Sequence, residues 1–363
     1  MGQEELKSDR FKSDILTSDN LKSDIFKVLW IVLLLAAVIV LFSGCSTPVV
    51  SDAASAKGLS AESSEVQNVQ TGETPPVCGV SIASDQSAYQ VRLYQIMQKQ
   101  AEEKGIQLIW KYADWDASLQ NRQIRELIDD KVDVLIICPV NSKSMLDSLK
   151  EARSREIPVV NLNMKVDAYS AVYIDTYVGA SSQEEGSLAA QLTTDLLPDG
   201  GKVAILEGTP GTDPQIYRTQ AFVDELGDRP DIHIADIRSA DWNRQEAEKE
   251  TERLIRRIPD LRLIYCQDNN MAAGAVAAIE EAGKEQTIEV IGIGEADQET
   301  IDLLRKGCLK GFVVQDPEFE AKSAVNCAVH LAEGEDVRPW IQNPVSIVTE
   351  ENVSDYHKPI EYM

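Results

Sequence analysis

From Val77 onward, short β-branched segments alternate with amphipathic stretches, and this alternation constrains the fold more than any other feature. Four patterns typical of buried strands come first, separated by three stretches with helical spacing. The strand patterns are Val77–Ala83, Ile106–Tyr112, Val132–Pro139 and Ile157–Leu162. The helical stretches are Tyr89–Lys104, Ser118–Asp130 and Ser144–Arg155. Such alternation indicates βαβ units that form a parallel sheet covered by helices on both faces.

The same rhythm starts again after Asp175. The second set of strand patterns is Lys202–Glu207, Ile232–Ile237, Leu261–Cys266 and Ile288–Ile293. The second set of helical stretches is Gln183–Leu196, Gln215–Leu226, Arg244–Ile258, Met271–Ala282 and Gln298–Lys306. Two successive halves of one architecture predict two α/β lobes, each built on a doubly wound parallel sheet, rather than one long sheet.

An uncharged apolar segment, Val28–Phe42, precedes the predicted lobes and ends in Ser43-Gly44-Cys45. Its 15 residues suit a signal-peptide core and fall short of the roughly 20 that a spanning helix needs. The segment around Cys45 resembles a bacterial lipobox, so we expect Cys45 to become the lipidated first residue of the mature chain. The alternative is an uncleaved transmembrane anchor, because no charge appears from Val28 to Ser51. Either interpretation places the rest of the chain outside the cytoplasmic membrane.

Two further segments complete the predicted division of the N-terminal region. Residues 1–27 contain five-residue repeats such as Leu6-Lys7-Ser8-Asp9-Arg10, and we expect a cytoplasmic tail to which no function is assigned. Residues 46–76 are rich in Ser, Ala, Glu, Val and Thr and predict a disordered linker. The signal segment or anchor, residues 28–45, lies between them.

Charge and side-chain composition exclude several functions. The 363 residues carry a formal net charge of −25 at pH 7, which opposes nucleic-acid binding because phosphate neutralisation needs clustered Lys and Arg. Self-repulsion of this size favours a monomer. His233, His330 and His357 lie far apart in the sequence, so no metal site is expected. Beyond Cys45, five cysteines remain without C-x-x-C spacing, which favours buried thiols over disulfides.

Five segments of the predicted lobes carry a family pattern. They are Gln123–Ile128, Val132–Ser142, Ile157–Val160, Gln267–Ala275 and Val313–Pro317. Together they resemble the type I periplasmic binding proteins, in the ribose- and galactose-binding branch, and the resemblance extends from Val77 to the C-terminus.

The resemblance implies two lobes joined by a hinge of three chain crossings. We place the crossings near Ile174-Asp175, Gln315-Asp316 and Asn343-Pro344. The N-terminal lobe would comprise residues 77–174 plus 316–343, and the C-terminal lobe residues 175–315 plus 344–363. A solute would bind between them, where the carboxyl ends of both sets of strands meet, and hinge motion would close the lobes on it.

Candidate ligand-binding residues follow from the same resemblance. Tyr89 follows the first strand and Trp242 follows the second lobe's second strand, where the family places aromatic rings against a sugar. Arg218 matches the family's arginine, whose planar fork can donate to two hydroxyls at once. Gln315, at the second crossing, can donate and accept.

Structural alternatives remain open for several aromatic and charged residues. Tyr89 could pack on the sheet at the start of a helix, and Arg218 could form a surface salt bridge with Asp224 or Glu225. Trp115 could form the rim of the cleft or contact a partner protein.

Other positions depart from the sugar-binding pattern. Asn163-Met164 stands where sugar binders carry Asp-Arg, and Asp268 begins an inverted form of the usual Asn-Asp pair. Cys138 replaces the asparagine of ribose binders, and Gly294 replaces an aspartate. Asp268, Asn163 and Cys138 remain candidate ligand residues at these positions. A site built for hydroxyl groups rejects analogues that leave its polar groups unpaired, so the ligand need not be ribose or galactose.

The sequence therefore predicts a lipid-anchored extracytoplasmic protein that binds a small sugar or sugar-like polar solute and delivers it to an ABC permease. A ligand sensor that presents its closed form to a membrane receptor or histidine kinase is the alternative. No nucleophile elbow, nucleotide-binding fingerprint or phosphate-binding loop occurs in the sequence. We expect no enzymatic activity and no cofactor.

Overall fold

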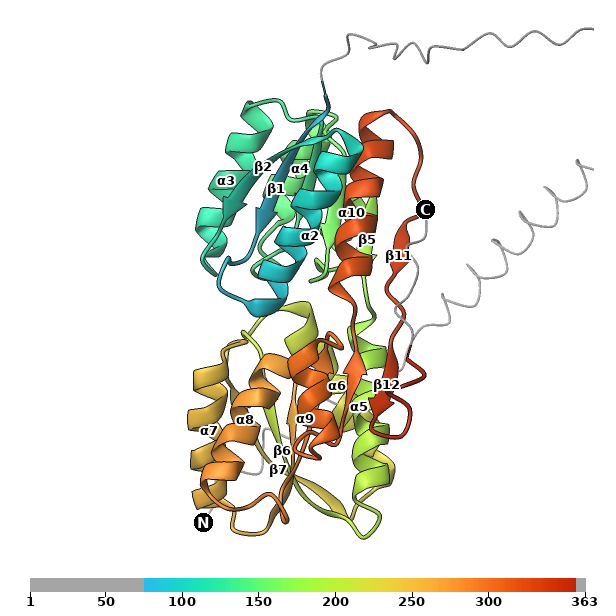
Figure 1. Cartoon of the computed structure of the whole chain (residues 1–363). Coiled ribbons are helices and arrows are strands. Elements are labelled where there is room, and N and C mark those ends of the chain that lie inside the picture. The colour runs from blue at the N-terminus through green and yellow to red at the C-terminus, as the bar shows by residue number, and fades with distance from the viewer. Residues whose placement is uncertain (1–74, 357–363) are drawn as a thin grey trace, which may run out of the picture. The chain divides into compact units, whose positions relative to one another are not determined.

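A computed structural model describes residues 75–356, and Figure 1 shows them as two lobes. The strands of the first lobe are β1 (Val77–Ile82), β2 (Gln107–Tyr112), β3 (Val134–Ile137), β4 (Val159–Leu162), β5 (Thr176–Gly179) and β11 (Trp340–Gln342). Its helices are α2 (Ala88–Lys104), α3 (Ala117–Asp129), α4 (Leu146–Ser154), η2 (Ala171–Tyr173) and α10 (Pro317–Ala332). The six strands form one sheet in the order β11-β5-β4-β3-β1-β2, and all its pairs are parallel.

The second lobe repeats this plan. Its strands are β6 (Gly201–Glu207), β7 (Ile232–Ser239), β8 (Leu261–Cys266), β9 (Glu289–Gly294), β10 (Gly311–Val314) and β12 (Ser346–Thr349). Its helices are α5 (Ser182–Leu196), α6 (Asp213–Glu225), η3 (Leu226–Asp228), α7 (Arg244–Arg257), α8 (Asn269–Glu281) and α9 (Gln298–Arg305). The strand order is β12-β10-β9-β8-β6-β7, with only β12 antiparallel to its neighbour.

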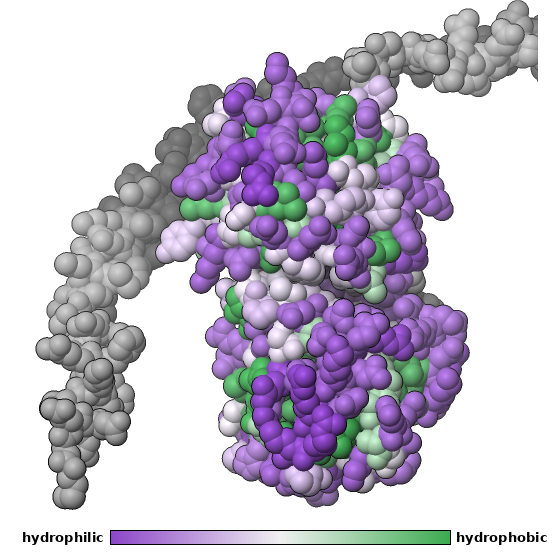
Figure 2. Space-filling view, turned by 90° about the vertical axis from the view of Figure 1, so that its left-hand side faces the viewer, coloured by the Kyte–Doolittle hydropathy of each residue, from purple (hydrophilic) through white to green (hydrophobic). Residues whose placement is uncertain are grey.

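Each sheet is buried on both faces because successive side chains along a strand point to opposite sides. In β3, Val134 and Ile136 pack in one apolar layer, and Leu135 and Ile137 pack in the other. The other sheet has an apolar layer on each side in the same way. Figure 2 shows the result, since hydrophilic side chains dominate the surface in that view. The predicted fold class, two doubly wound lobes, is confirmed.

The chain passes between the two sheets three times. The first passage follows β5, at Ala180-Ser181, so the prediction of Ile174-Asp175 placed it too early. The reason is that Thr176–Gly179 pairs with β4 and β11 and belongs to the first sheet. The other passages lie at Gln315-Asp316, between β10 and α10, and at Asn343-Pro344, between β11 and β12.

Several predicted features lie outside the described residues. They are the tail 1–27, the signal segment or anchor 28–45 with Cys45, and nearly all of the linker 46–76. Among residues 75–356, no helix is both long enough and apolar enough to cross a bilayer.

One close approach between helices helps to place the site. A Cβ added to Gly186 of α5 would overlap the backbone oxygen of Arg218 on α6. Glycine therefore lets the two helices approach each other at the turn of α6 that carries Arg218.

Candidate functional site

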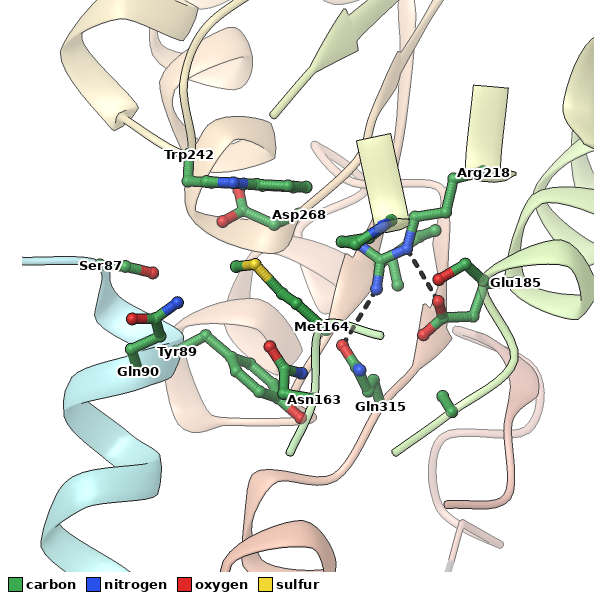
Figure 3. A pocket seen from close by; sticks show the side chains of 15 residues that line it. Ser87, Tyr89, Gln90, Asn163, Met164, Glu185, Arg218, Trp242, Asp268 and Gln315 are labelled. Atoms are coloured by element: carbon green, nitrogen blue, oxygen red, sulfur yellow. Dashed lines mark hydrogen bonds and ion pairs between the residues drawn. The ribbon is translucent and has the colours of Figure 1, made fainter. Parts of the chain in front are cut away.

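A cavity of about 40 Å³ lies between the lobes, at the carboxyl ends of the strands. Both lobes and two of the crossings contribute to its lining, and Figure 3 labels ten of these residues. The lining residues are Ser87, Tyr89, Gln90, Asn163, Met164, Ala180, Ser182, Glu185, Pro214, Arg218, Trp242, Asp268, Ile293, Gly294 and Gln315. The structure thus brings six of the seven predicted ligand residues around one cavity.

Arg218 is held from three sides within the second lobe and the hinge. Its Nε donates to Glu185 Oε2 at 2.8 Å and its Nη1 to the Gln267 carbonyl oxygen at 2.6 Å. Its Nη2 donates to Gln315 Oε1 at 3.1 Å. The side chain is only 5% exposed and that of Glu185 only 1%, so the ion pair lies in the interior and is not the surface salt bridge considered above. Three of five guanidinium N–H groups are used among the described residues, which leaves two for a solute.

Burial determines the electrostatics of the Arg218 ion pair. Burial raises the pKa of Glu185, and the neighbouring Arg218 charge partly opposes that shift. Because an unpaired charge is costly in the interior, each partner holds the other in its ionised form. The guanidinium is therefore a fixed donor at one side of the cavity.

Trp242 owes its position to a left-handed turn. Asp241 and Trp242 have φ angles of 52° and 60°, and the Trp242 ring lies where a Cβ on Gly208 would be. The ring centre is 6.0 Å from the Arg218 guanidinium carbon. Trp242 is 7% exposed, and its buried Nε1 has no hydrogen-bond partner among the described residues. A buried N–H without a partner costs free energy, so a solute acceptor would satisfy it.

Tyr89 reaches the cavity from the other lobe. Figure 3 shows the Tyr89 and Trp242 rings on different sides of the cavity, with the Met164 side chain projecting between them. Burial and the negative charge of Glu320 raise the pKa of Tyr89 well above its usual value, so the hydroxyl stays protonated. Aromatic faces from both lobes suit the apolar C–H faces of a sugar or cyclic polyol.

Asp268 supplies the cavity with an acceptor. It is the N-cap of α8, where its Oδ1 accepts from the Met271 N–H at 2.6 Å. Burial raises the pKa of Asp268 to about 7, although Met271 and Arg218 oppose the shift. A second acid, Asp213, accepts from the Oγ of the lining residue Ser182 at 2.5 Å, and burial raises its pKa to about 6. Donors on a solute would favour the ionised form of Asp268.

Cys138 differs from the expectation that it contacts the ligand. It is fully buried and lies behind the lining, with its Sγ 3.7 Å from Gln90 Nε2 and 4.0 Å from Asn163 Oδ1. Asn163 itself lines the cavity and donates through Nδ2 to Glu320 Oε2 at 2.9 Å. Cys138 therefore contacts the lining residues Gln90 and Asn163 but does not line the cavity itself.

Two buried acids were missed by sequence reasoning. Glu185 and Glu320 each lie within about one helical turn of a crossing, in α5 and α10. Both are almost completely buried. Each acid has a second acidic residue close to it in its helix, Glu184 in α5 and Glu318 in α10, so the sequence alone does not indicate which of the two is buried.

The lobes also contact each other around the cavity. The Ser142 N–H donates to the Gly211 carbonyl oxygen at 3.1 Å, and Arg92 lies 3.5 Å from Glu295. Trp115, whose role the sequence left open, packs against apolar clusters of both lobes. These contacts close the lobes over the cavity.

Comparison with known proteins agrees with this geometry. The family model described as a periplasmic binding protein domain matches residues 78–336. The chain belongs to the type I periplasmic binding proteins. A ribose import binding protein of Bacillus subtilis is 28% identical over 272 residues, which cover 75% of this chain and 87% of the relative. A xylitol-binding protein of Mycolicibacterium smegmatis is 28% identical, covering 71% of this chain and 72% of the relative.

Solved structures of the same family share the fold of this binding protein. An ABC transporter solute-binding protein of Bacillus halodurans with bound myo-inositol is 27% identical, with a TM-score of 0.74. The match covers 79% of this chain and 99% of that protein. These relatives are solute-binding proteins and not enzymes, in agreement with the expectation that this binding protein has no enzymatic activity.

The first prediction concerns the place of the Trp242 ring. Gly208→Ala should displace this ring, because the new Cβ would overlap it, and should weaken solute binding at least fivefold. Calorimetric titration and the melting temperature measure the effect, with Gly227→Ala as the control because no atom lies within 4 Å of its added Cβ. A Gly208→Ala variant with wild-type affinity and melting temperature would contradict this placement of the ring.

The second prediction concerns Asp268 without solute. Its folded-state pKa of about 7 exceeds the roughly 3.9 of an unfolded Asp, so its stabilisation is complete below pH 4 and is lost as pH rises through 7. Asp268→Asn, which keeps an N-cap, should raise the free energy of unfolding by about 1–3 kcal/mol at pH 8 and leave it unchanged at pH 4. Denaturant unfolding at both pH values measures this, and equal effects at the two values would refute it.

Proposed function

We propose that this chain is the extracytoplasmic substrate-binding protein of an ABC transporter and captures a small polyhydroxylated solute, a sugar or a sugar-like polyol, in the interlobe cavity. The closed form would then dock on a permease. The observation that carries the proposal is the buried Arg218 guanidinium beside a Trp242 ring whose N–H has no partner among the described residues.

The polar groups of the cavity complement hydroxyl groups. Arg218 and the Trp242 N–H donate, and Asp268 accepts. A hydroxyl can donate and accept at once, so a polyol satisfies both kinds of group, whereas a hydrocarbon satisfies neither. The names of relatives that bind ribose or xylitol, and the myo-inositol bound to a solved relative, support the same class of solute.

Membrane attachment through Cys45 belongs to the same proposal. The lipobox-like segment would tether the lobes to the outer side of the cytoplasmic membrane through the linker 46–76. A tethered binding protein stays near its permease, which raises the effective concentration of the docking partner.

Solute binding is the third prediction. In calorimetric titrations of the full-length chain with ribose, xylitol, myo-inositol, galactose and representative amino acids, a polyol or sugar should bind and amino acids should not. Trp242→Ala should raise the Kd about five- to thirtyfold, because apolar burial and stacking worth about 1–2 kcal/mol are lost.

The matched control for Trp242→Ala is Trp110→Ala. Trp110 meets Tyr94 edge-on and lies parallel to Tyr112 in the first lobe, and it does not line the cavity. Binding of amino acids alone, or equal affinity in wild type and Trp242→Ala, would overturn the proposed solute class or site.

Lipidation is the fourth prediction. A bacterial host that expresses the wild-type chain should incorporate labelled fatty acid into it, and Cys45→Ser should abolish the label. Cys78→Ser is the control, because Cys78 is a buried thiol of β1. An unlabelled wild-type chain that remains in the membrane with its N-terminus intact would favour the transmembrane anchor instead.

A further inference from the structure

A fully buried carboxylate lies directly behind the cavity on the first lobe's side. Glu320 of α10 accepts three hydrogen bonds from side-chain amides. Asn163 Nδ2 donates to its Oε2 at 2.9 Å, while Gln315 Nε2 and Asn343 Nδ2 donate to its Oε1 at 3.1 and 3.0 Å. Burial raises the pKa of Glu320 to about 7, although the amide hydrogen bonds oppose the shift, so at pH 8 the carboxylate is mostly ionised. An ionised carboxylate can only accept, so each of these amides must then turn its nitrogen toward Glu320.

The other end of the Asn163 amide is also fixed in direction. The backbone N–H of Ser84 donates to Gln90 Oε1 at 2.8 Å, which turns Gln90 Nε2 toward Cys138 Sγ, 3.7 Å away. Burial raises the pKa of Cys138 to about 12, so the thiol keeps its proton and faces Asn163 Oδ1 at 4.0 Å. These contacts form one chain of hydrogen bonds that begins at the Ser84 N–H and ends at the Glu320 carboxylate. Only one assignment of donors and acceptors along this chain is consistent with both ends.

Asn163 therefore presents its carbonyl oxygen, and not its NH2 group, to the cavity that it lines. Figure 3 shows this oxygen on the cavity side of the amide. At 4.0 Å the thiol is a weak partner, and a carbonyl oxygen has two lone pairs. One acceptor site on the first lobe's side of the cavity thus remains for a solute.

We propose that Glu320 is a positioning residue that sets the hydrogen-bond polarity of this side of the cavity, holding the Asn163 carbonyl oxygen toward the solute and so selecting a solute that donates at this point. The inference rests on the proposed solute-binding function and deepens it, because it states what the solute must offer to the first lobe. A hydroxyl meets the requirement, whereas an ether or carbonyl oxygen at the same place leaves two acceptors facing each other.

Glu320→Gln tests the idea because the new amide has one acceptor and one donor at the two places where the carboxylate has two acceptors. Its oxygen should stay with the two donors Gln315 and Asn343, which leaves its NH2 group facing Asn163. Asn163 must then turn over and present its own NH2 group to the cavity. The Tyr89 hydroxyl, which lies beside the same carboxylate, can rotate to suit either partner and does not decide the direction.

Glu320 also touches the hinge, so a loss of affinity alone would not separate polarity from hinge geometry. A second substitution makes the separation. In Glu320→Gln combined with Asn163→Asp, the introduced carboxylate accepts from the introduced amide and again presents an acceptor to the cavity. We expect the contacts of Gln315 and Asn343 to be the same in the single Glu320→Gln variant and in the double variant, so the two differ in the polarity and the charge at position 163.

The binding experiment is a calorimetric titration at pH 8 with the tightest of ribose, xylitol and myo-inositol. Glu320→Gln should weaken binding at least tenfold, and the double variant should return to within about threefold of wild type. Asn163→Asp alone, with two carboxylates in contact, should weaken binding at least as much as Glu320→Gln. The surface substitution Glu126→Gln, whose partner is Lys111, is the control and should change nothing.

A solute-independent measurement keeps this inference separate from the proposed function. Asparagine-selective ¹⁵N labelling of the full-length chain, with Asn163→Asp to assign the signal, reports the Asn163 side-chain NH2 group. In wild type its protons should exchange slowly, since they lie against a buried carboxylate, and in Glu320→Gln they should exchange at least tenfold faster. Unchanged exchange, or a double variant that binds as weakly as Glu320→Gln, would overturn the role of Glu320. Failure of wild type to bind any of the three solutes, with the exchange change still observed, would overturn the solute class alone.

Discussion

The buried ion pair between Arg218 and Glu185 is the interaction on which the arrangement of the cavity depends. Two charges taken out of water need excellent geometry and further hydrogen bonds, and Arg218 obtains these from Gln267 and Gln315. Gln315 lies at a crossing, and its Nε2 donates a hydrogen bond to Glu320 in the other lobe. A continuous polar network therefore joins both lobes through the hinge, and it lies immediately beside the place where a solute would bind.

Each lobe has the same type of left-handed Asp-Trp turn on the side that faces the other lobe. Asp114-Trp115 and Asp241-Trp242 are matching left-handed turns after the second strand of each lobe. Trp242 covers the cavity, whereas Trp115 packs against the apolar clusters of both lobes. One turn type, repeated, thus supplies both a solute-facing ring and a contact that spans the lobes. Closure and binding are coupled to the extent that the solute touches both sides.

Hydrophobic periodicity made the fold predictable, because a fully buried parallel strand such as β3 is an uninterrupted apolar run in the sequence. The short strand β5 is not such a run. The hydroxyl of its buried Tyr177 donates toward the carbonyl oxygens of Asn163 and Ala180. Because β5 contains this polar side chain, it lacks an apolar strand pattern, and the first crossing was predicted too early in the chain. The family resemblance, and not hydrophobic periodicity, singled out the residues that the structure brings around one cavity, namely Arg218, Trp242, Asp268, Tyr89, Asn163 and Gln315.

The parts of the site that sequence could not supply are those that depend on pairing across long separations. Arg218 meets Glu185 from another helix, and Glu320 meets Asn163 across 157 positions of the chain. No local sequence pattern predicts such pairs, because the burial of each side chain and the identity of its partner depend on how the folded chain brings distant segments together. For the same reason Cys138, expected at the ligand, lies one layer behind it.

The most direct test of the account is a crystal structure of the full-length chain with the tightest-binding polyol. We expect one solute molecule between Trp242 and Tyr89, with hydroxyls on Arg218 and Asp268 and a hydroxyl donating to the Asn163 oxygen. A solute bound outside this cavity, or bound within it without contact to Arg218 and Trp242, would contradict the account.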